Sequence, residues 1–250
     1  MNGLLNTFNF SEKDFLAFSL EHFLIILFFS VLGFRLIIFA KSANNKTKNK
    51  IAFWITIVLI LNIVFSQIIG FLLGEFDIKS SLPLNLCNFC PFLLPLVLIK
   101  KKYWWHEILY FWIMVGTLQA TLTPDLQYSL PHRMAIQYWI THCGLVVATL
   151  YATVVFNFIP TWKSLIKSFI AINVFIGIIS VVNKVTGGNY MFLSEKPEQE
   201  TLLDFLGESY IFWGEFLAIG LMLIMFLPIL YFYPQANTFK NEKQTHLCPK

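Results

Sequence analysis

The chain has 250 residues, of which 57% are hydrophobic, 27 are Phe and 13% are charged, and its formal net charge is +4. This composition excludes a water-soluble globular domain and indicates a protein that crosses a membrane several times. The basic residues that give the positive charge lie mainly beside the ends of the apolar stretches, as is usual in membrane proteins. The charge therefore gives no support to nucleic-acid binding. P-loop motifs are also absent from the sequence, so neither nucleic acid nor nucleotide is expected as a partner.

Apolar stretches divide the chain into membrane spans. A helix needs about 20 mostly apolar residues to cross a hydrocarbon core of roughly 30 Å. We therefore expect an all-α membrane protein with seven transmembrane helices, at residues 20–40, 51–73, 82–99, 104–122, 134–158, 165–186 and 209–233. The third stretch is short and contains Pro91 and Pro95, so it is expected to be kinked or partly re-entrant.

Lysine and arginine predict how this bundle is oriented. Thirteen of the eighteen basic residues fall in alternate loops and the C-terminal tail, and these loops are expected on the cytoplasmic side. This places the N-terminus outside and the C-terminus inside. The predicted division is an extracytoplasmic segment at 1–19, a seven-helix domain at 20–233 and a cytoplasmic tail at 234–250. Residues 1–19 lack a basic stretch followed by an apolar one, so no cleavable signal peptide is expected, and the predicted location is the cell membrane.

Polar residues within the predicted spans gather in the outer half of the membrane. His142 is expected about 12 Å below the outer surface and Glu215 about two turns into the seventh span. Ionisable groups at such depths are rare and usually functional. The inner halves are expected to carry far fewer polar groups, with His142 the only histidine well inside a span. The other polar residues of the outer half are His22, Gln119, Thr121 and Asn183, and the last three are more often hydrogen-bonding contacts between helices.

The segment Leu82-Pro-Leu-Asn-Leu-Cys-Asn-Phe-Cys-Pro91 places two thiols and two carboxamides at the mouth of an apolar span. Unpaired polar groups in hydrocarbon cost several kcal/mol each, so Asn85, Cys87 and Asn88 must face protein, water or a substrate. Cys87 and Cys90 share one helical face and could form a redox pair. However, no second pair lies on the outer side to pass electrons onward. Two cysteines without a regular histidine pair also do not make a zinc site, so no metal or other cofactor is expected.

A nucleophile needs only one thiol and one base. Cys87 and His142 share the predicted outer leaflet, so Cys87 could attack an acyl carbonyl while His142 takes and later returns the proton. Donors to the resulting oxyanion, or groups that orient the imidazole, could come from Asn85, Asn88 or Gln119. In a site that faces lipid, the expected acyl donor and partner is a membrane phospholipid.

Four segments carry a family resemblance: Leu82-Pro-Leu-Asn-Leu-Cys87, Tyr110-Phe-Trp-Ile-Met-Val-Gly-Thr-Leu-Gln-Ala-Thr-Leu-Thr-Pro-Asp125, the span from His132 to His142, and Gly187-Gly-Asn-Tyr-Met-Phe192. Together they resemble the YwaF-type family of integral membrane proteins, which is similar to a eukaryotic transmembrane acyltransferase acting on ether phospholipids. The resemblance implies that Cys87 is the nucleophile and His142 its partner. That family often has His where this chain has Asn85, and many members have no thiol at the position of Cys90.

Two other functions remain open at this point. A transporter or small-molecule binding protein could use an outward-facing polar cavity lined by His22, Gln119, His142 and Glu215, and a thiol oxidoreductase could use Cys87 with Cys90. A retinal-type photoreceptor is excluded because the seventh span has no lysine for a Schiff base. The remaining candidates for substrate binding or orientation are His132, Arg133, Asn189 and Tyr190.

Overall fold

The computed structural model describes residues 14–196 and 206–233, and this part of the chain is helical. Its main helices are α2 (Leu20–Ser42), α3 (Asn45–Leu72), α4 (Leu86–Leu94), α5 (Tyr103–Phe111), α6 (Leu118–Leu122), α7 (Arg133–Val155), α8 (Trp162–Thr186) and α9 (Tyr210–Phe232). Residues 1–13 of the predicted N-terminal segment, residues 197–205 and the predicted tail at 234–250 lie outside the described residues.

Five helices of the described part are long and apolar enough to cross a membrane: α2, α3, α7, α8 and α9. Each coincides with a predicted span to within a few residues. The other two predicted spans are interrupted. Leu86–Ile99 is a shorter apolar helix, and residues 103–122 form a continuous helical run in three segments. The finding supports a multi-pass helical membrane protein, while the count of seven crossings stays a prediction.

Both interrupted spans contain a stretch of π-helix. The first, η1 (Pro95–Ile99), continues α4, and the second, η2 (Trp112–Thr117), joins α5 to α6. A π segment within a helix is uncommon and often lies at a functional site. Pro95 at the start of η1 has no N–H to continue the α-helical pattern, which explains the change of pitch there.

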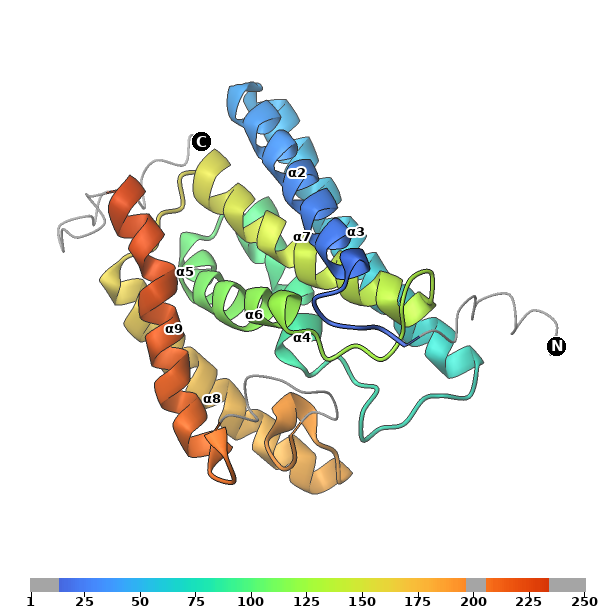
Figure 1. Cartoon of the computed structure of the whole chain (residues 1–250). Coiled ribbons are helices and arrows are strands. Elements are labelled where there is room, and N and C mark those ends of the chain that lie inside the picture. Colours follow the sequence, from blue (N-terminus) through green and yellow to red (C-terminus); the bar gives the residue numbers. More distant parts are fainter. Residues whose placement is uncertain (1–13, 197–205, 234–250) are drawn as a thin grey trace.

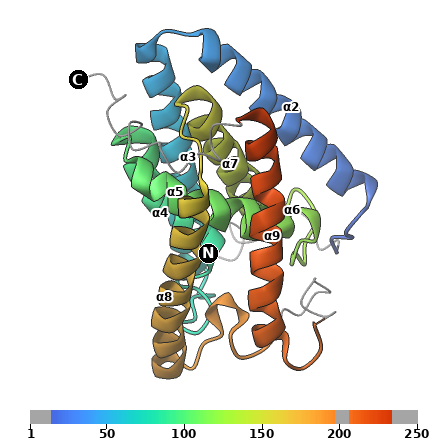
Figure 2. The same ribbon diagram turned by 90° about the vertical axis from the view of Figure 1, so that its left-hand side faces the viewer.

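Helix α7 forms the centre of the bundle. It packs against α2, α3, α4, α6 and η2, whereas α8 packs on α5 and α9 packs on η2. Figure 1 shows α2, α3 and α7 running together on one side and α8 and α9 on the other, with α4, α5 and α6 between them. In Figure 2, α2 is inclined to the paired helices α8 and α9. The outward faces of α2, α3, α8 and α9 are apolar and exposed, as expected for surfaces in contact with lipid.

Two glycines allow α7 to approach its neighbours closely. A Cβ atom on Gly33 of α2 would lie 2.6 Å from Val147 Cγ2, and one on Gly144 of α7 would lie 2.6 Å from Leu59 Cδ2 of α3. Small residues at such crossings let transmembrane helices pack by direct backbone approach. The three helices α2, α3 and α7 therefore form one closely packed unit.

The inner half of the bundle differs from the prediction because it contains a buried polar cluster. His106 and Glu107, in the first turns of α5, are only 1% and 6% exposed. Glu107 accepts a hydrogen bond from Ser164 Oγ at 2.8 Å and forms an ion pair with Lys167 of α8. His106 Nε2 lies 3.2 Å from Thr153 Oγ1 of α7. His106 is thus a buried histidine near the start of the predicted span 104–122, and the expectation that His142 is the only histidine well inside a span stays a prediction.

Candidate functional site

Cys87 lies in the first turn of α4, at the start of the predicted third span. The helix begins at Leu86 because residues 82–85 form a turn, with Asn85 at the N-cap position. The Cys87 side chain is partly exposed, and its Sγ atom lies 3.4 Å from Thr117 Oγ1 at the end of η2. The thiol therefore lies at the N-terminal end of α4, next to the free backbone N–H groups of its first turn.

The N-terminal turn of α4 also leaves backbone donors available. The N–H groups of Leu86 and Cys87 precede the first hydrogen bond that the helix can make, and the side chain of Asn85 does not cap them. Asn85 Oδ1 instead accepts a hydrogen bond from Met191 N–H at 2.8 Å. Asn85 therefore fastens the loop around η3 (Tyr190–Phe192) to the start of α4.

Cys90 has a different environment from Cys87. It lies one turn further along α4, is 0% exposed, and packs in the main apolar core. Both thiols are free. Thiol exchange requires access to a partner, so burial of Cys90 makes it a packing residue beside the more accessible Cys87.

Side chains from other helices bind the last carbonyl groups of α6. Tyr138 Oη of α7 donates to Ala120 O at 2.7 Å, and His22 Nε2 of α2 donates to Thr121 O at 2.9 Å. The final carbonyls of a helix lack partners within the helix, so these bonds replace the missing ones. They bring α2, α6 and α7 together within about one turn of Thr117, the partner of Cys87.

His22 uses both of its ring nitrogens in this arrangement. Nδ1 accepts from Phe18 N–H at 3.0 Å, so Nε2 carries the proton that it donates to Thr121 O. The ring is 2% exposed and packs against Phe15 and Trp139. His22 therefore has a structural role and leaves no free nitrogen for a substrate.

His142 has one nitrogen occupied and one available. Nδ1 lies 2.8 Å from Tyr138 O, and because a carbonyl only accepts, Nδ1 must be the protonated nitrogen. The lone pair is then on Nε2, which has no hydrogen-bond partner among the described residues. The hydrogen bond from Nδ1 to a backbone carbonyl orients the ring, and Nε2 is then the nitrogen that can act as a base.

Tyr138 connects His142 with Cys87. The His142 ring stacks on the Tyr138 ring, with the two centroids 3.8 Å apart and the planes inclined by 22°. The Tyr138 phenol donates to Ala120 O, three residues after Thr117, whose hydroxyl lies 3.4 Å from Cys87 Sγ. The predicted nucleophile and base are thus linked through Tyr138 and residues 117–120, although no hydrogen bond joins them directly in the described structure.

Polar side chains next to this pair form a contact between three helices. Asn62 of α3 donates to Thr141 Oγ1 at 2.9 Å and to Gln137 O at 3.0 Å. Gln137 Nε2 reaches Asn88 Oδ1 of α4 at 3.4 Å, which is at the long end for a hydrogen bond. Asn88 therefore joins α4 to α7. Asn62 and Gln137 were missed by the sequence reasoning, although Asn62 was detectable as a carboxamide inside an apolar stretch.

A polar cavity of about 450 Å³, lined in part by Tyr138, lies at the end of the bundle that contains η3. Three predicted site residues line it: Asn85, Asn189 and Tyr190. Its charged residues include both signs: Lys79, Asp125, Glu195 and Lys196. This cavity brings a polar surface to the first turn of α4.

The loop that borders the cavity is fastened by Asn189 and Tyr190. Asn189 Oδ1 accepts from Ser194 N–H at 2.9 Å. Tyr190 Oη donates to Ile78 O at 2.6 Å and accepts from Leu82 N–H at 3.0 Å. Tyr190 is 1% exposed, and burial raises the pKa of its phenol. Both residues shape the cavity by holding its walls.

The other predicted site residues lie apart from the Cys87 and His142 pair. His132 is the N-cap of α7, where its Nδ1 accepts a hydrogen bond from Met134 N–H at 3.3 Å. Burial, and to a smaller extent the nearby Arg133 charge, lowers the pKa of His132. Arg133 forms an ion pair with Glu75 at the end of α3. Gln119 donates to Thr123 Oγ1 at 2.6 Å within the end of α6.

Glu215 is half-buried in α9 and forms no hydrogen bond or ion pair with another described residue. α9 meets the rest of the bundle mainly through Phe226, Met222 and their neighbours. The structure does not bring Glu215 into the cluster around Cys87. Metal binding gains no support either, since no three His, Cys, Asp or Glu side chains gather around a common point within residues 14–196 and 206–233.

Comparison with known proteins gives one match. The model of the TMEM164 family, a family of transmembrane proteins, matches residues 17–226. The match extends from just before α2 into α9 and includes every residue of the cluster described above. No curated protein and no solved structure matches this chain.

Proposed function

This chain belongs to the TMEM164 family of transmembrane proteins, and we propose that it transfers acyl groups between membrane lipids through the Cys87 thiol. The observation that carries the proposal is that Cys87 and His142 approach the same part of the helical run 112–122: Cys87 contacts Thr117, and His142 stacks on Tyr138, which donates to Ala120 O. His142 Nε2 is the nitrogen available to accept a proton. Cys87 is the partly exposed thiol of α4, in contrast to the buried Cys90.

The proposed reaction has two balanced halves. Cys87 Sγ attacks the ester carbonyl of a phospholipid, and its proton passes to His142 Nε2, either directly or through one water. The ester C–O bond then breaks, the departing lysolipid oxygen takes the proton from His142, and the acyl group remains on Cys87 as a thioester. The hydroxyl of a second lysolipid reverses these steps. Its proton passes through His142 to the departing thiolate, so no cofactor is consumed.

Two neighbouring features support this chemistry. The N–H groups of Leu86 and Cys87, at the start of α4, are donors suited to the oxyanion of the tetrahedral intermediate. The polar cavity lined by Asn85 and Tyr138 suits a lipid head group, because it contains charged residues of both signs. A phospholipid head held there would place its ester groups on the membrane side of the head, toward Cys87.

The test is acyl transfer by the purified full chain in phosphatidylcholine vesicles. A phospholipid with a radiolabelled acyl chain is supplied together with an unlabelled lysophospholipid. We expect Cys87→Ala to abolish transfer, and we expect His142→Gln to lower its rate by about 10²–10⁴-fold, the usual contribution of a general base. Labelled acyl groups should be recoverable on the Cys87 peptide of the wild type as a hydroxylamine-sensitive thioester.

Cys90→Ala is the matched control, because it removes a thiol from the same helix without removing the nucleophile. It should keep most of the activity. Equal loss of acyl transfer in Cys87→Ala and Cys90→Ala would contradict Cys87 as the single nucleophile, and equal loss of labelling by a lipid-like electrophile in both variants would favour a thiol oxidoreductase. Full transfer by Cys87→Ala would refute the acyl-transfer proposal.

A second function, the binding or transport of a small polar molecule, is favoured by the polar cavity itself. In that case Asn85→Ala and Lys79→Gln would weaken binding of a ligand, whereas Cys87→Ala would leave binding unchanged. Equilibrium binding measured with these three variants distinguishes the two functions.

A further inference from the structure

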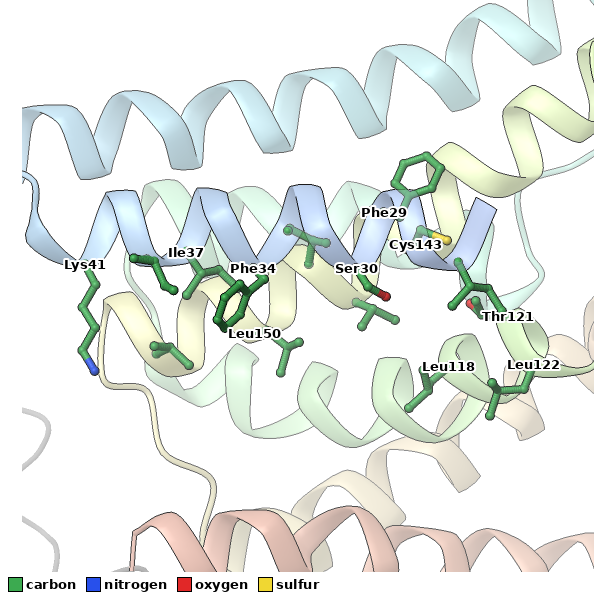
Figure 3. A pocket seen from close by; sticks show the side chains of 16 residues that line it. Phe29, Ser30, Phe34, Ile37, Lys41, Leu118, Thr121, Leu122, Cys143 and Leu150 are labelled. Carbon is green, nitrogen blue, oxygen red and sulfur yellow. The ribbon is translucent and has the colours of Figure 1, made fainter. Parts of the chain in front are cut away.

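A separate, apolar groove runs along the face of α2 that meets α7 and α6. Figure 3 shows its lining side chains extending from Lys41 at one end to Thr121 and Leu122 at the other. Its volume is about 510 Å³. Of the sixteen residues that line it, all but Ser30, Lys41, Thr121 and Cys143 have side chains of carbon and hydrogen alone or none. The groove is therefore suited to a hydrocarbon chain.

The groove opens sideways, toward the surface that faces lipid. Phe34, Ile38 and Leu122 on its rim are 66%, 54% and 51% exposed. Its floor is formed where Gly33 lies against Val147, at the close crossing of α2 and α7. A lipid chain can therefore enter from the bilayer without any movement of the helices.

The size of the groove favours one lipid chain over a helix of a partner protein. From Ile26 to Lys41 the groove follows α2 over fifteen rises of 1.5 Å, which is about 22 Å. This is longer than one leaflet of a hydrocarbon core of roughly 30 Å, so a complete acyl chain fits along it. A helix about 10 Å across and equally long would occupy ~1,700 Å³, more than three times the space available.

Lys41 supplies the charge that selects the lipid. It lies in the last turn of α2, is exposed, and forms no ion pair or hydrogen bond with another described residue. Lysines near membrane surfaces attract anionic head groups. We propose that the groove binds one acyl chain of an anionic phospholipid, with Lys41 paired to its phosphate, in the leaflet at the lysine-rich end of the bundle.

This lipid would stabilise the turn of α6 that lies next to Thr117, the residue in contact with Cys87. The far end of the groove is formed by Thr121 and Cys143. Thr121 carries the carbonyl that holds His22, and its hydroxyl donates to Thr117 O at 2.8 Å. The bound chain therefore packs against the same turn of α6 that positions Thr117 beside Cys87. The lipid site does not depend on acyl transfer by Cys87.

Photochemical crosslinking tests the site. The full chain is reconstituted in phosphatidylcholine vesicles that contain phosphatidylglycerol with a photoactivatable group in its acyl chain, and the crosslinked peptides are identified by mass spectrometry. Crosslinks should concentrate on the residues that line the groove, at 26–41 of α2, 118–122 of α6 and 143–154 of α7. Crosslinks spread evenly over the exposed faces of α2, α8 and α9 would overturn the proposal.

Two pairs of variants test the chain and the head group separately. Leu150→Trp fills the groove and should abolish these crosslinks, whereas Leu223→Trp on the exposed side of α9 should leave them unchanged. Lys41→Gln should reduce crosslinking by phosphatidylglycerol about fivefold, the factor equivalent to ~1 kcal/mol for one lysine near an anionic lipid. Lys50→Gln, an exposed lysine at the same end of the bundle but outside the groove, should have no such effect.

The outcomes against the proposal are equally specific. Unchanged crosslinking in Leu150→Trp would show that the chain binds elsewhere. Equal effects of Lys41→Gln and Lys50→Gln would show general surface attraction without a site. A photoactivatable phosphatidylcholine that labels the groove as strongly as phosphatidylglycerol would refute selection by charge. Because Cys87→Ala should not alter any of these results, their failure is distinguishable from failure of the acyl-transfer proposal.

Discussion

The buried polar residues of this bundle differ in whether all of their donor and acceptor atoms have hydrogen-bond partners. His22 uses both ring nitrogens on backbone groups, and Tyr190 both donates and accepts through its hydroxyl. His142 instead has one occupied nitrogen and one available nitrogen. Buried polar groups are costly unless paired, so an unpaired one that persists is a candidate for function. This distinction separates His142 from His22 by the partners of their ring nitrogens, which the sequence does not report.

His132 gives a prediction about pH. Burial and the Arg133 charge lower its pKa, while the Glu75 carboxylate partly opposes them, so the folded state favours the neutral ring. Neutral Nδ1 is also the form that caps α7 by accepting from Met134 N–H. This contribution to stability is present above the ordinary histidine pKa of about 6.5 and is lost as the pH falls below it. Thermal unfolding in detergent should show a loss of about 1 kcal/mol between pH 8 and pH 5, the usual value of a cap.

His132→Asn provides the control for this effect, because Asn caps a helix but does not titrate. The variant should be as stable as the wild type at pH 8 and should lack the loss assigned to His132 at pH 5. If it lost as much stability as the wild type, other groups would account for the pH dependence.

At the scale of helices, close crossings determine how α7 occupies the centre. Gly144 of α7 faces Leu59 of α3, a side chain that is 2% exposed. Gly144→Ala would place a methyl group 2.6 Å from Leu59 Cδ2, so we expect a loss of about 1–3 kcal/mol, the typical cost of overpacking. Unfolding of the purified protein by a denaturing detergent measures this loss.

Leu59→Ala should relieve the clash. Each single variant is destabilised, but the double variant should be destabilised by less than the sum of the two, because the two side chains compete for the same space. Gly177→Ala in α8 is the matched control, since no atom lies within 4 Å of its added Cβ. Additive losses at Gly144 and Leu59 would contradict the proposed contact.

For the whole molecule, the long helices were predictable and the interruptions only in part. Hydropathy located α2, α3, α7, α8 and α9 because lipid imposes a simple requirement for length and apolarity. The segment η2 escaped prediction because it changes the pitch without changing the composition, whereas Pro91 and Pro95 indicated an irregular helix where η1 begins. The turn before α4 escaped it because apolar residues such as Leu82 and Leu84 continue the pattern of the span.

The site was predictable only in part, for a related reason. Cys87 and His142 were identifiable as polar residues in apolar surroundings, and the structure links them through Tyr138 and residues 117–120. The pairing of His22 with Thr121 O was not identifiable, because its partner is a backbone carbonyl freed by the end of α6. Glu107 was overlooked because its partner, Lys167, lies 60 residues away on α8. Contacts of this kind depend on which helices are neighbours, which composition does not report.

The short third span is the point on which the whole topology depends. Leu86–Ile99 has 14 residues, or about 21 Å of α-helix, less than a core of roughly 30 Å. However, the polar cavity lined by Asn85 brings a polar surface to the start of α4, so the hydrocarbon left to cross is thinner there. The following run, residues 103–122, measures about 30 Å and can return across the membrane without help. We therefore expect both segments to cross.

Cysteine labelling tests this topology in a chain whose native cysteines have been replaced. Ser80→Cys, before α4, should react with a membrane-impermeant maleimide in intact cells, because its loop carries few basic residues and is predicted to lie outside. Ser42→Cys and Lys102→Cys should react only after permeabilisation, since both lie in lysine-rich loops. All three positions are exposed, so burial would not hide them. Labelling of Lys102→Cys together with Ser80→Cys in intact cells would mean that residues 86–99 re-enter the same side, and the polar cavity would then be the mouth of a re-entrant loop.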